Sequence, residues 1–236
     1  MPKLTAMMIV RNEADRFLYR CLNSLTNYVD EIIILDDAST DETPDICLSF
    51  PAVKLYRQNS STFLIDEAQL RQKLWHYTID NNPDWILAID ADEFIETSSI
   101  NEIPYLLKQK DFKAISFRLF DCWGSEEYYR VDGLWNPWLR GFSIYMVKYQ
   151  PQLPSDWPSL KFHCGRIPIA YRRLPHYESD LRIKHLGWVN PLNNNAKYKR
   201  AISQDPTYKY MSREHYESIL WPSEKILLKK WKELSC

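Results

Sequence analysis

An uncharged run at residues 85–89, Trp-Ile-Leu-Ala-Ile, leads directly into the acidic segment Asp90-Ala91-Asp92-Glu93. The run is rich in residues that favour β-structure, which predicts a short buried strand. Residues two apart in an extended chain project to the same side, so we expect Asp90 and Asp92 to face one point at the carboxyl end of this strand. Open α/β sheets bind ligands at that end. Paired carboxylates repel unless they are compensated, and a hard divalent cation is the simplest compensation; an ordinary solvated loop is the alternative.

Two earlier apolar runs also end in polar residues. Residues 31–35 lead into Asp36-Asp37, and residues 4–10 lead into Arg11-Asn12-Glu13. An aspartate at a strand end can accept a hydrogen bond from a nucleobase or a ribose hydroxyl, and Arg11 can reach a phosphate. Helix capping by the residues that follow each strand is the competing interpretation.

The order of these runs predicts the fold class. Strands are expected at 4–10, 31–35, 53–56, 85–89 and 114–119, and helices at 15–28, 66–81 and 100–110. Alternation of strand and helix at this spacing predicts an α/β fold with a doubly wound, mostly parallel sheet flanked by helices. The continuous apolar character of residues 32–35 fits a parallel strand that is covered on both faces.

Glycine usage excludes two common nucleotide-binding motifs. The chain has five glycines, and the first of them is Gly124. A dinucleotide-binding fingerprint and a P-loop both need glycines in the first strand-to-helix turn. If the chain binds a phosphorylated nucleotide, another group must neutralise the phosphates, and a metal ion held by carboxylates can do so.

Composition narrows the partners and the compartment. The net charge is −1 and the pI is about 6.5, with no basic stripe, so we expect no nucleic acid partner. The five cysteines are scattered without a Cys-x-x-Cys pair, which argues against a zinc ribbon or a disulfide framework. We see no signal-peptide layout and no run of 18 apolar residues, and we therefore expect a cytoplasmic protein.

Three segments together resemble a known enzyme family. "MMIVRNEADRFLYRCLNSL", "VDEIIILDDASTDETPDI" and "WILAIDADEFI" resemble family 2 glycosyltransferases of the GT-A fold. The resemblance covers residues 4–120 in order and spacing. It implies transfer of a sugar from a nucleoside diphosphate sugar, with inversion, to a carbohydrate, lipid-linked or protein acceptor.

The same resemblance assigns individual residues. It implies that Asp37 binds the nucleobase, that Asp90 lies near the ribose and the metal, and that Asp92 binds Mn²⁺ or Mg²⁺. Arg71 is the expected nucleotide contact on the helix at 66–81, although the family's usual Ala-Arg-Asn segment is altered there. His185 matches a late histidine that completes the metal shell or touches the diphosphate; packing as an ordinary histidine is the alternative.

The catalytic base is expected in the second half of the chain. An inverting transferase needs a carboxylate that takes the proton of the acceptor hydroxyl. Asp121 and Asp156 are the first two candidates. Related sequences often show a His-Glu pair near the acceptor, whereas this chain has His163-Cys164 at that place. Arg118, Arg140 and Arg166 are candidates for phosphate contacts or for ion pairs.

We expect one domain over residues 1–236, with a nucleotide-binding half at 1–97 and an acceptor-binding half at 98–236. The tail at 219–234 mixes apolar residues with lysines. It is predicted to form a C-terminal helix that either docks onto its own domain or lies on the inner face of a membrane.

Two other functions compete with sugar transfer. A nucleotidyltransferase also pairs a metal with acidic strand ends, but it usually carries a glycine-rich basic loop, which this chain lacks. A catalytically silent carbohydrate-binding or scaffold protein on the same fold is favoured by the missing His-Glu pair. Donor binding without turnover would distinguish the scaffold from the enzyme.

Overall fold

The computed structural model describes residues 1–158, 160 and 163–233, and within these residues ten strands form a single sheet. The strands are β1 Leu4–Val10, β2 Glu31–Asp36, β3 Val53–Arg57, β4 Trp85–Ala88, β5 Glu93–Ile95, β6 Ala114–Trp123, β7 Tyr128–Arg130, β8 Ser143–Lys148, β9 His176–Trp188 and β10 Leu228–Lys230. The α-helices are α1 Leu18–Leu25, α2 Thr43–Leu48, α3 Glu67–Ile79, α4 Ile103–Lys108, α5 Pro137–Arg140, α6 Asn194–Gln204 and α7 Arg213–Glu217. The 3₁₀ helices are η1 Thr97–Glu102, η2 Gly133–Trp135, η3 Ile169–Arg173, η4 Pro191–Asn193, η5 Ser218–Leu220 and η6 Ser223–Lys225.

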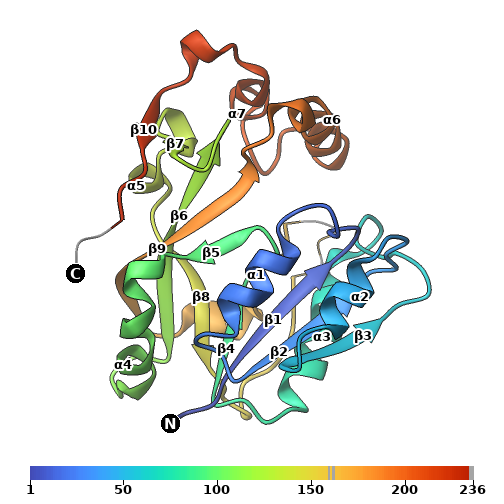
Figure 1. Cartoon of the computed structure of the whole chain (residues 1–236), viewed down its shortest axis with the longest axis vertical. Helices are drawn as coiled ribbons and strands as arrows, with labels where there is room; N and C mark the ends of the chain where they lie inside the picture. Colours follow the sequence, from blue (N-terminus) through green and yellow to red (C-terminus); the bar gives the residue numbers. More distant parts are fainter. Residues whose placement is uncertain (159, 161–162, 234–236) are drawn as a thin grey trace.

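The first half of the chain forms the parallel part of the sheet. Strands β3, β2, β1 and β4 are neighbours in that order, and each adjacent pair is parallel (Figure 1). Strand β8 then pairs antiparallel with β4, and β6 pairs antiparallel with β8, so the sheet continues across residue 97 into the second half. The predicted α/β fold is confirmed, with an antiparallel extension that the sequence pattern did not indicate.

Helices cover both faces of the parallel part, which explains its continuous apolar strands. Ile32 and Ile34 of β2 pack in one cluster with Leu22 of α1. Ile33 packs on the opposite face in a cluster with Leu70 of α3. Side chains alternate along a strand, so a strand that is apolar at every position buries both faces of the sheet.

The strands and helices predicted between residues 4 and 119 agree with the structure apart from their ends. Helix α1 begins at Leu18 rather than at residue 15, and no side chain caps its first turn. Helix α3 is capped by Asp66, whose carboxylate accepts a hydrogen bond from the backbone N–H of Gln69 at 2.9 Å. Strand β6 continues to Trp123, four residues beyond its predicted end at 119.

Strand β9 connects the two halves of the molecule. It runs parallel to β6 and antiparallel to β5, and its register places His185 opposite both Asp121 and Glu93. The acidic segment that follows β4 is therefore held against a strand almost one hundred residues further along the chain. Figure 1 shows β9 and β6 running together from the sheet toward α6 and α7.

Helices α6 and α7 pack around an aromatic cluster. Trp123, Trp135, Tyr216 and Ile219 form its buried centre, and Trp188 packs against it. Trp123 and Trp135 are buried in this cluster, so both tryptophans pack in the core.

The predicted C-terminal helix is wrong. The tail instead contains η5, η6 and β10, and β10 pairs antiparallel with β7. Pro222 lacks a backbone N–H, and its predecessor Trp221 is extended, so a continuous helix is interrupted there. Leu234, the last residue of the predicted helix, lies outside the described residues. The helical surface on which membrane contact depended is therefore absent from residues 219–233, and no helix in the described part of the chain is long and apolar enough to cross a bilayer.

Candidate functional site

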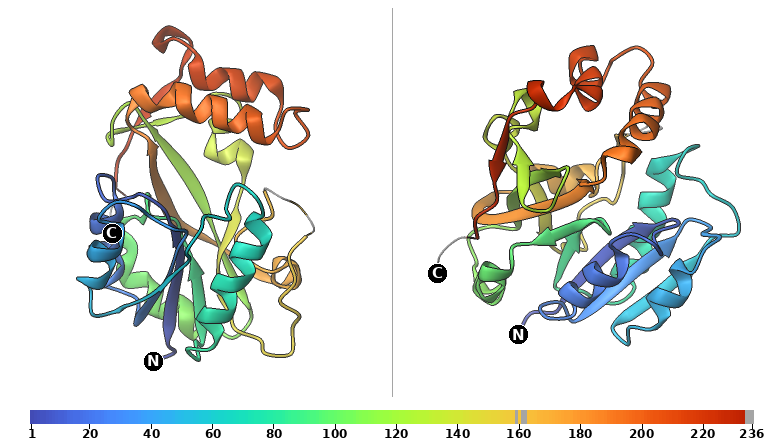
Figure 2. Two further views of the ribbon diagram at one scale, coloured as in Figure 1. Left: turned by 90° about the vertical axis from the view of Figure 1, so that its right-hand side faces the viewer. Right: turned by 45° about the horizontal axis from the view of Figure 1, so that its top comes forward.

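A cavity of about 510 Å³ lies at the carboxyl ends of β1, β2 and β4, and we name it the acidic cavity. It brings together six residues that the sequence singled out: Arg11, Asp37, Arg71, Asp90, Asp92 and His185. Figure 2 shows α6 beside the loop that precedes α3, and both segments contribute residues to the cavity wall. The volume is within the usual range for small-molecule sites.

The acidic segment forms a tight turn that is fixed from beneath by Glu93. The backbone N–H of Glu93 donates to the carbonyl of Asp90 at 3.1 Å, and the backbone N–H of Asp90 donates to Glu93 Oε2 at 3.0 Å. Arg166 donates to both carboxylate oxygens of buried Glu93 and lies 3.0 Å from Asp90 Oδ2. Glu93 and Arg166 therefore position the turn, whereas the side chain of Asp90 is 38% exposed and faces the cavity.

Asp92, His185 and Asp121 form a connected series at the cavity floor. His185 Nε2 lies 3.5 Å from Asp92 Oδ2, and His185 Nδ1 lies 2.6 Å from Asp121 Oδ1. Burial opposes ionisation of all three groups, but the opposite charges dominate. They raise the pKa of His185 to about 10, lower the pKa of Asp121 to about 2, and hold the pKa of Asp92 well below its usual range.

Asp92 and His185 place two donor atoms of the kinds that bind metal ions beside Gly187. A Cβ at Gly187 would lie 2.5 Å from His185 Nε2 and 3.0 Å from Asp92 Oδ2, so glycine keeps this space open. A carboxylate oxygen and a neutral imidazole nitrogen are donors that suit Mn²⁺, so a metal ion must displace the proton from His185 Nε2. The bond from Nδ1 to Asp121 fixes the ring as in many metal-binding histidines. Among the described residues, no group of three or more His, Cys, Asp or Glu side chains is arranged to hold a metal ion.

Asp121 is poorly placed to act as a base. It is 2% exposed, and while Oδ1 faces His185, Oδ2 accepts a hydrogen bond from Arg140 at 2.6 Å. Both carboxylate oxygens are therefore engaged, and a pKa of about 2 makes the group a weak proton acceptor. The geometry instead gives Asp121 the role of positioning His185.

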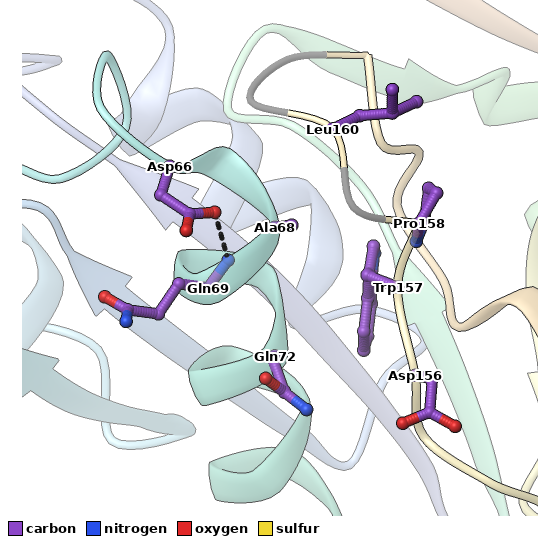
Figure 3. Close-up of a pocket in the computed structure, with 8 residues that line it drawn as sticks. All are labelled: Asp66, Ala68, Gln69, Gln72, Asp156, Trp157, Pro158 and Leu160. Atoms are coloured by element: carbon purple, nitrogen blue, oxygen red, sulfur yellow. Dashed lines mark hydrogen bonds between the residues drawn. The ribbon is translucent and has the colours of Figure 1, made fainter.

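Asp156, the other candidate base, lies at a second cavity of about 540 Å³. This cavity lies between the first turns of α3 and the segment that contains Trp157, and its wall includes Gln69 and Gln72 of the helix (Figure 3). Asp156 is not among the residues that line the acidic cavity. The structure therefore does not bring the two candidate bases together.

Asp37 lies on the acidic cavity, but its carboxylate is already engaged. It accepts hydrogen bonds from the backbone N–H of Thr62 at 2.8 Å and from the Ser61 hydroxyl at 2.6 Å. The side chain of Gln58 donates a further bond at 3.0 Å. Asp37 thus orders residues 58–63 along the cavity rim, and a nucleobase that bonds this carboxylate must replace one of these donors.

The cavity wall carries more positive charge than the sequence analysis anticipated. Its cationic side chains are Arg11, Arg16, Arg71, Lys197 and Arg200. Arg16 lies 3.7 Å from Asp92 and 2.6 Å from Glu13. Burial lowers the pKa of Lys197 to about 8, and neighbouring Asp92 only partly offsets this effect. Arg16, Lys197 and Arg200 carry no local motif that identifies them, because only the packing of α1 and α6 places them here.

Glu13 is an acid of the cavity wall with an unusual titration. Its Oε2 is buried and has no hydrogen-bond partner among the described residues, although Oε1 pairs with Arg16. Burial raises the pKa of Glu13, and the positive charge of Arg16 lowers it by a smaller amount because Arg16 is 37% exposed. The resulting pKa is about 7. The folded protein therefore holds a proton on Glu13 at pH values where the unfolded chain has released it.

This proton predicts a pH dependence of stability. The folded pKa of about 7 exceeds the ordinary value of 4.5, so the free energy of unfolding should fall as pH rises from 4.5 to 7. In Glu13→Gln, the free energy of unfolding should fall less over this pH range, by on the order of 2–3 kcal/mol. Urea unfolding of the metal-free protein at pH 5 and pH 8 measures it, with exposed Glu224→Gln as the control. Equal pH dependence in wild type and Glu13→Gln would show that Glu13 is ionised in the fold.

Cys164, at the place of the family's usual glutamate, is fully buried. The neighbouring backbone N–H of His163 donates to Glu67 Oε2 at 2.9 Å, and Glu67 Oε1 pairs with Arg71 at 3.0 Å. Glu67 therefore links this loop to a residue of the acidic cavity. Cys164 itself cannot replace a carboxylate that reaches an acceptor.

A family profile and a curated relative both point to glycosyltransferases. The Glycosyl transferase family 2 profile matches residues 5–220. The SPbeta prophage-derived glycosyltransferase SunS of Bacillus subtilis is 28% identical over 204 residues, which cover 84% of this chain and 42% of SunS. The chain spans about half the length, or less, of the curated relatives it matches first.

Solved structures show the same fold. Residues 1–349 of Staphylococcus aureus TarS in complex with UDP-GlcNAc superpose with a TM-score of 0.58 at 15% identity, covering 92% of this chain and 70% of that one. The mannosyltransferase PcManGT from Pyrobaculum calidifontis, in complex with GDP-Man and Mn²⁺, gives a TM-score of 0.52 at 15% identity and covers 93% and 70%. At this identity the likeness establishes a shared GT-A fold.

Proposed function

The chain belongs to glycosyl transferase family 2, and from this membership we propose that its acidic cavity binds a nucleoside diphosphate sugar and transfers the sugar to an acceptor. The observation that carries the proposal is the meeting of Asp37, Asp90, Asp92 and His185 in one cavity with five cationic side chains. Acidic groups suit a metal and the hydroxyls of a ribose, while the cations suit the phosphates.

We assign roles to the residues as follows. Asp92 and His185 would hold Mn²⁺ or Mg²⁺, which supplies charge stabilisation at the diphosphate when bound. Asp90 accepts hydrogen bonds from the ribose, and Asp37 with Arg11 and Arg71 forms the wall at the nucleotide. Glu93 and Arg166 hold the acidic turn in place, which keeps the reacting groups aligned.

Several features of the reaction are part of the same proposal. We propose inversion, in which the acceptor hydroxyl attacks the sugar carbon from the face opposite the departing diphosphate. The TarS complex makes a uridine nucleotide the first candidate donor, and the PcManGT complex makes guanosine the second. The acceptor is a carbohydrate, a lipid-linked sugar or a protein. Four free, buried cysteines in the described part of the chain fit a cytoplasmic compartment.

Calorimetry tests the proposed donor site. UDP, GDP, dTDP and CDP are titrated into the wild-type protein with Mn²⁺ and again with EDTA. We expect one nucleotide to bind much more tightly than the others, and Mn²⁺ to strengthen its binding. If none of the four binds under either condition, the acidic cavity is not a nucleotide site and the proposal fails.

A silent scaffold remains the second candidate, because buried Cys164 replaces the family's glutamate and neither predicted base reaches the acidic cavity. Turnover separates the two functions. The matching nucleotide sugar is incubated with the protein and Mn²⁺, and release of nucleoside diphosphate is followed. Slow hydrolysis of the donor supports the enzyme, whereas tight binding without any release supports the scaffold.

The positioning role of Asp121 gives a prediction that a catalytic base would not share. Asp121→Asn weakens the acceptor for His185 Nδ1–H, so Mn²⁺-dependent nucleotide binding should weaken about 10- to 100-fold. Nucleotide binding in EDTA should change little. Calorimetry under both conditions makes the measurement. Unchanged Mn²⁺-dependent binding together with abolished turnover would instead assign Asp121 as the base.

A further inference from the structure

Helix α6 presents one polar face to the acidic cavity. Lys197, Arg200 and Gln204 line the cavity and lie three or four residues apart, which places them on one side of the helix. They come from the second half of the chain, whereas Asp90 and Asp92 come from the first. Figure 2 shows α6 next to the loop before α3, across the carboxyl ends of the parallel strands.

Among the described residues, Lys197 forms no ion pair with a carboxylate, and Asp92 acts on its charge only from a greater distance. The Nζ of Lys197 donates to the carbonyl oxygen of Gly187 and lies 4.4 Å from the centre of the Trp188 ring. Both contacts fix the ammonium beside the space that Gly187 leaves open next to Asp92 and His185. An ammonium that is partly removed from water is costly unless a negative group compensates it.

Two of the other cations of the cavity, Arg16 and Arg71, have carboxylate partners, whereas Arg11 bonds a neutral hydroxyl. Arg16 pairs with Glu13, Arg71 pairs with Glu67, and Arg11 donates to the hydroxyl of Ser61 at 2.6 Å. Among the described residues, neither Lys197 nor Arg200 forms an ion pair with a carboxylate. The two α6 cations, like Arg11, therefore have no carboxylate in an ion pair among the described residues and are available for an anionic ligand.

We propose that Lys197 and Arg200, which we call the α6 pair, bind the diphosphate of the donor and stabilise the negative charge that develops on it. This inference rests on the proposed function. In the transfer, the bond between the sugar carbon and the β-phosphate oxygen breaks, and its electron pair stays on that oxygen. The acceptor oxygen forms the new bond to the sugar carbon, and its proton passes to a base or to water.

The two residue types suit different parts of such a group. Lys197 is a compact point charge fixed close to the metal-binding pair of Asp92 and His185. Arg200 is more exposed, and its planar guanidinium can bond two phosphate oxygens at once. Charge on the departing diphosphate would then be compensated from two sides, by a metal ion held at Asp92 and His185 and by the α6 pair.

Calorimetry with UDP, UMP and uridine tests the α6 pair, with GDP, GMP and guanosine titrated in parallel. Lys197→Met should weaken diphosphate binding about 10- to 100-fold and leave nucleoside binding unchanged, because only the phosphates meet α6. Arg200→Gln should act in the same direction. Lys197→Arg, which keeps the charge, should recover part of the affinity. Lys199→Met is the matched control, since Lys199 is on the same helix, is exposed and does not line the cavity.

Each outcome of this experiment is decisive. If Lys197→Met and Arg200→Gln bind the diphosphate as tightly as wild type, the α6 pair is overturned and the proposed function stands. If the wild type binds none of the nucleotides, the proposed function fails and the α6 pair fails with it. A loss of binding to nucleoside and diphosphate alike, with a lowered melting temperature, would mean that Lys197 acts only in folding.

Discussion

Asp92→Asn is expected to lower sugar transfer by about 10³-fold, because it removes the negative oxygen that faces His185 Nε2 in the space kept open by Gly187. An amide oxygen carries no net charge and binds a divalent cation weakly. The substitution also leaves His185 with only Asp121 to balance its charge. Mn²⁺ should no longer strengthen nucleotide binding in this variant.

Two measurements check this result. Calorimetry with and without Mn²⁺ reports binding, and release of nucleoside diphosphate from the sugar donor reports turnover. Asp111→Asn is the control, since Asp111 is an exposed acid away from the cavity. Metal-dependent nucleotide binding that survives in Asp92→Asn would show that the metal lies elsewhere, and the assignment of the acidic turn would be wrong.

Arg166→Met is expected to destabilise the fold by about 3–5 kcal/mol, because it leaves the carboxylate of Glu93 buried without a counter-charge. Glu93 is 1% exposed, and its carboxylate accepts hydrogen bonds from Nη1 and Nη2 of Arg166. The Tyr145 hydroxyl donates a further hydrogen bond at 3.2 Å. The pair also fixes the turn that carries Asp90. Nucleotide binding should therefore weaken even under conditions where the variant remains folded.

Urea unfolding measures the loss, and two further variants identify its cause. Arg20→Met breaks another Arg–Glu pair, but Arg20 and its partner Glu126 are 55% and 38% exposed, so it should cost no more than about 1 kcal/mol. Glu93→Gln combined with Arg166→Met should recover part of the stability, since no buried charge is then left alone. Similar losses in Arg166→Met and Arg20→Met would mean that burial adds nothing to the pair.

The cavity wall offers the phosphates of a bound nucleotide positive charge in addition to any metal ion. The paired carboxylates and the missing glycine loop indicated that a metal ion can neutralise the phosphates, with Arg11 as a further contact. In the fold, five cationic side chains line the same cavity as Asp90 and Asp92. Nucleotide binding in EDTA, compared between wild type and Lys197→Met, separates the contribution of α6 from that of the metal.

The arginines that the sequence offered as phosphate contacts have other partners. Arg140 bonds Asp121, and Arg166 bonds Glu93 and Asp90. The guanidinium of Arg118 lies 3.7 Å from the centre of the Phe142 ring. Their positions in the chain gave no means to choose between a phosphate and an ion pair, since that choice depends on which carboxylate or ring packs nearby.

The sequence by itself determined the parallel half of the sheet and one wall of the site. Strands β1 to β4 and helix α3 follow from local apolar patterns, and the residues after each strand reach the cavity because carboxyl ends of parallel strands share one edge. These signals lie within a few residues of each other along the chain. Local pattern therefore predicted Asp37, Asp90 and Asp92 without knowledge of any distant contact.

Only the tertiary structure decided the rest of the site. The pairing of β9 with β5 and β6 places His185 between Asp92 and Asp121. The packing of α6 brings Lys197 and Arg200 into the cavity that holds Asp90 and Asp92 of the first half. The tail became strand β10 through its pairing with β7, although its composition suggested a helix. Such contacts join segments tens of residues apart, and their free energy comes from burial and register that no local pattern encodes.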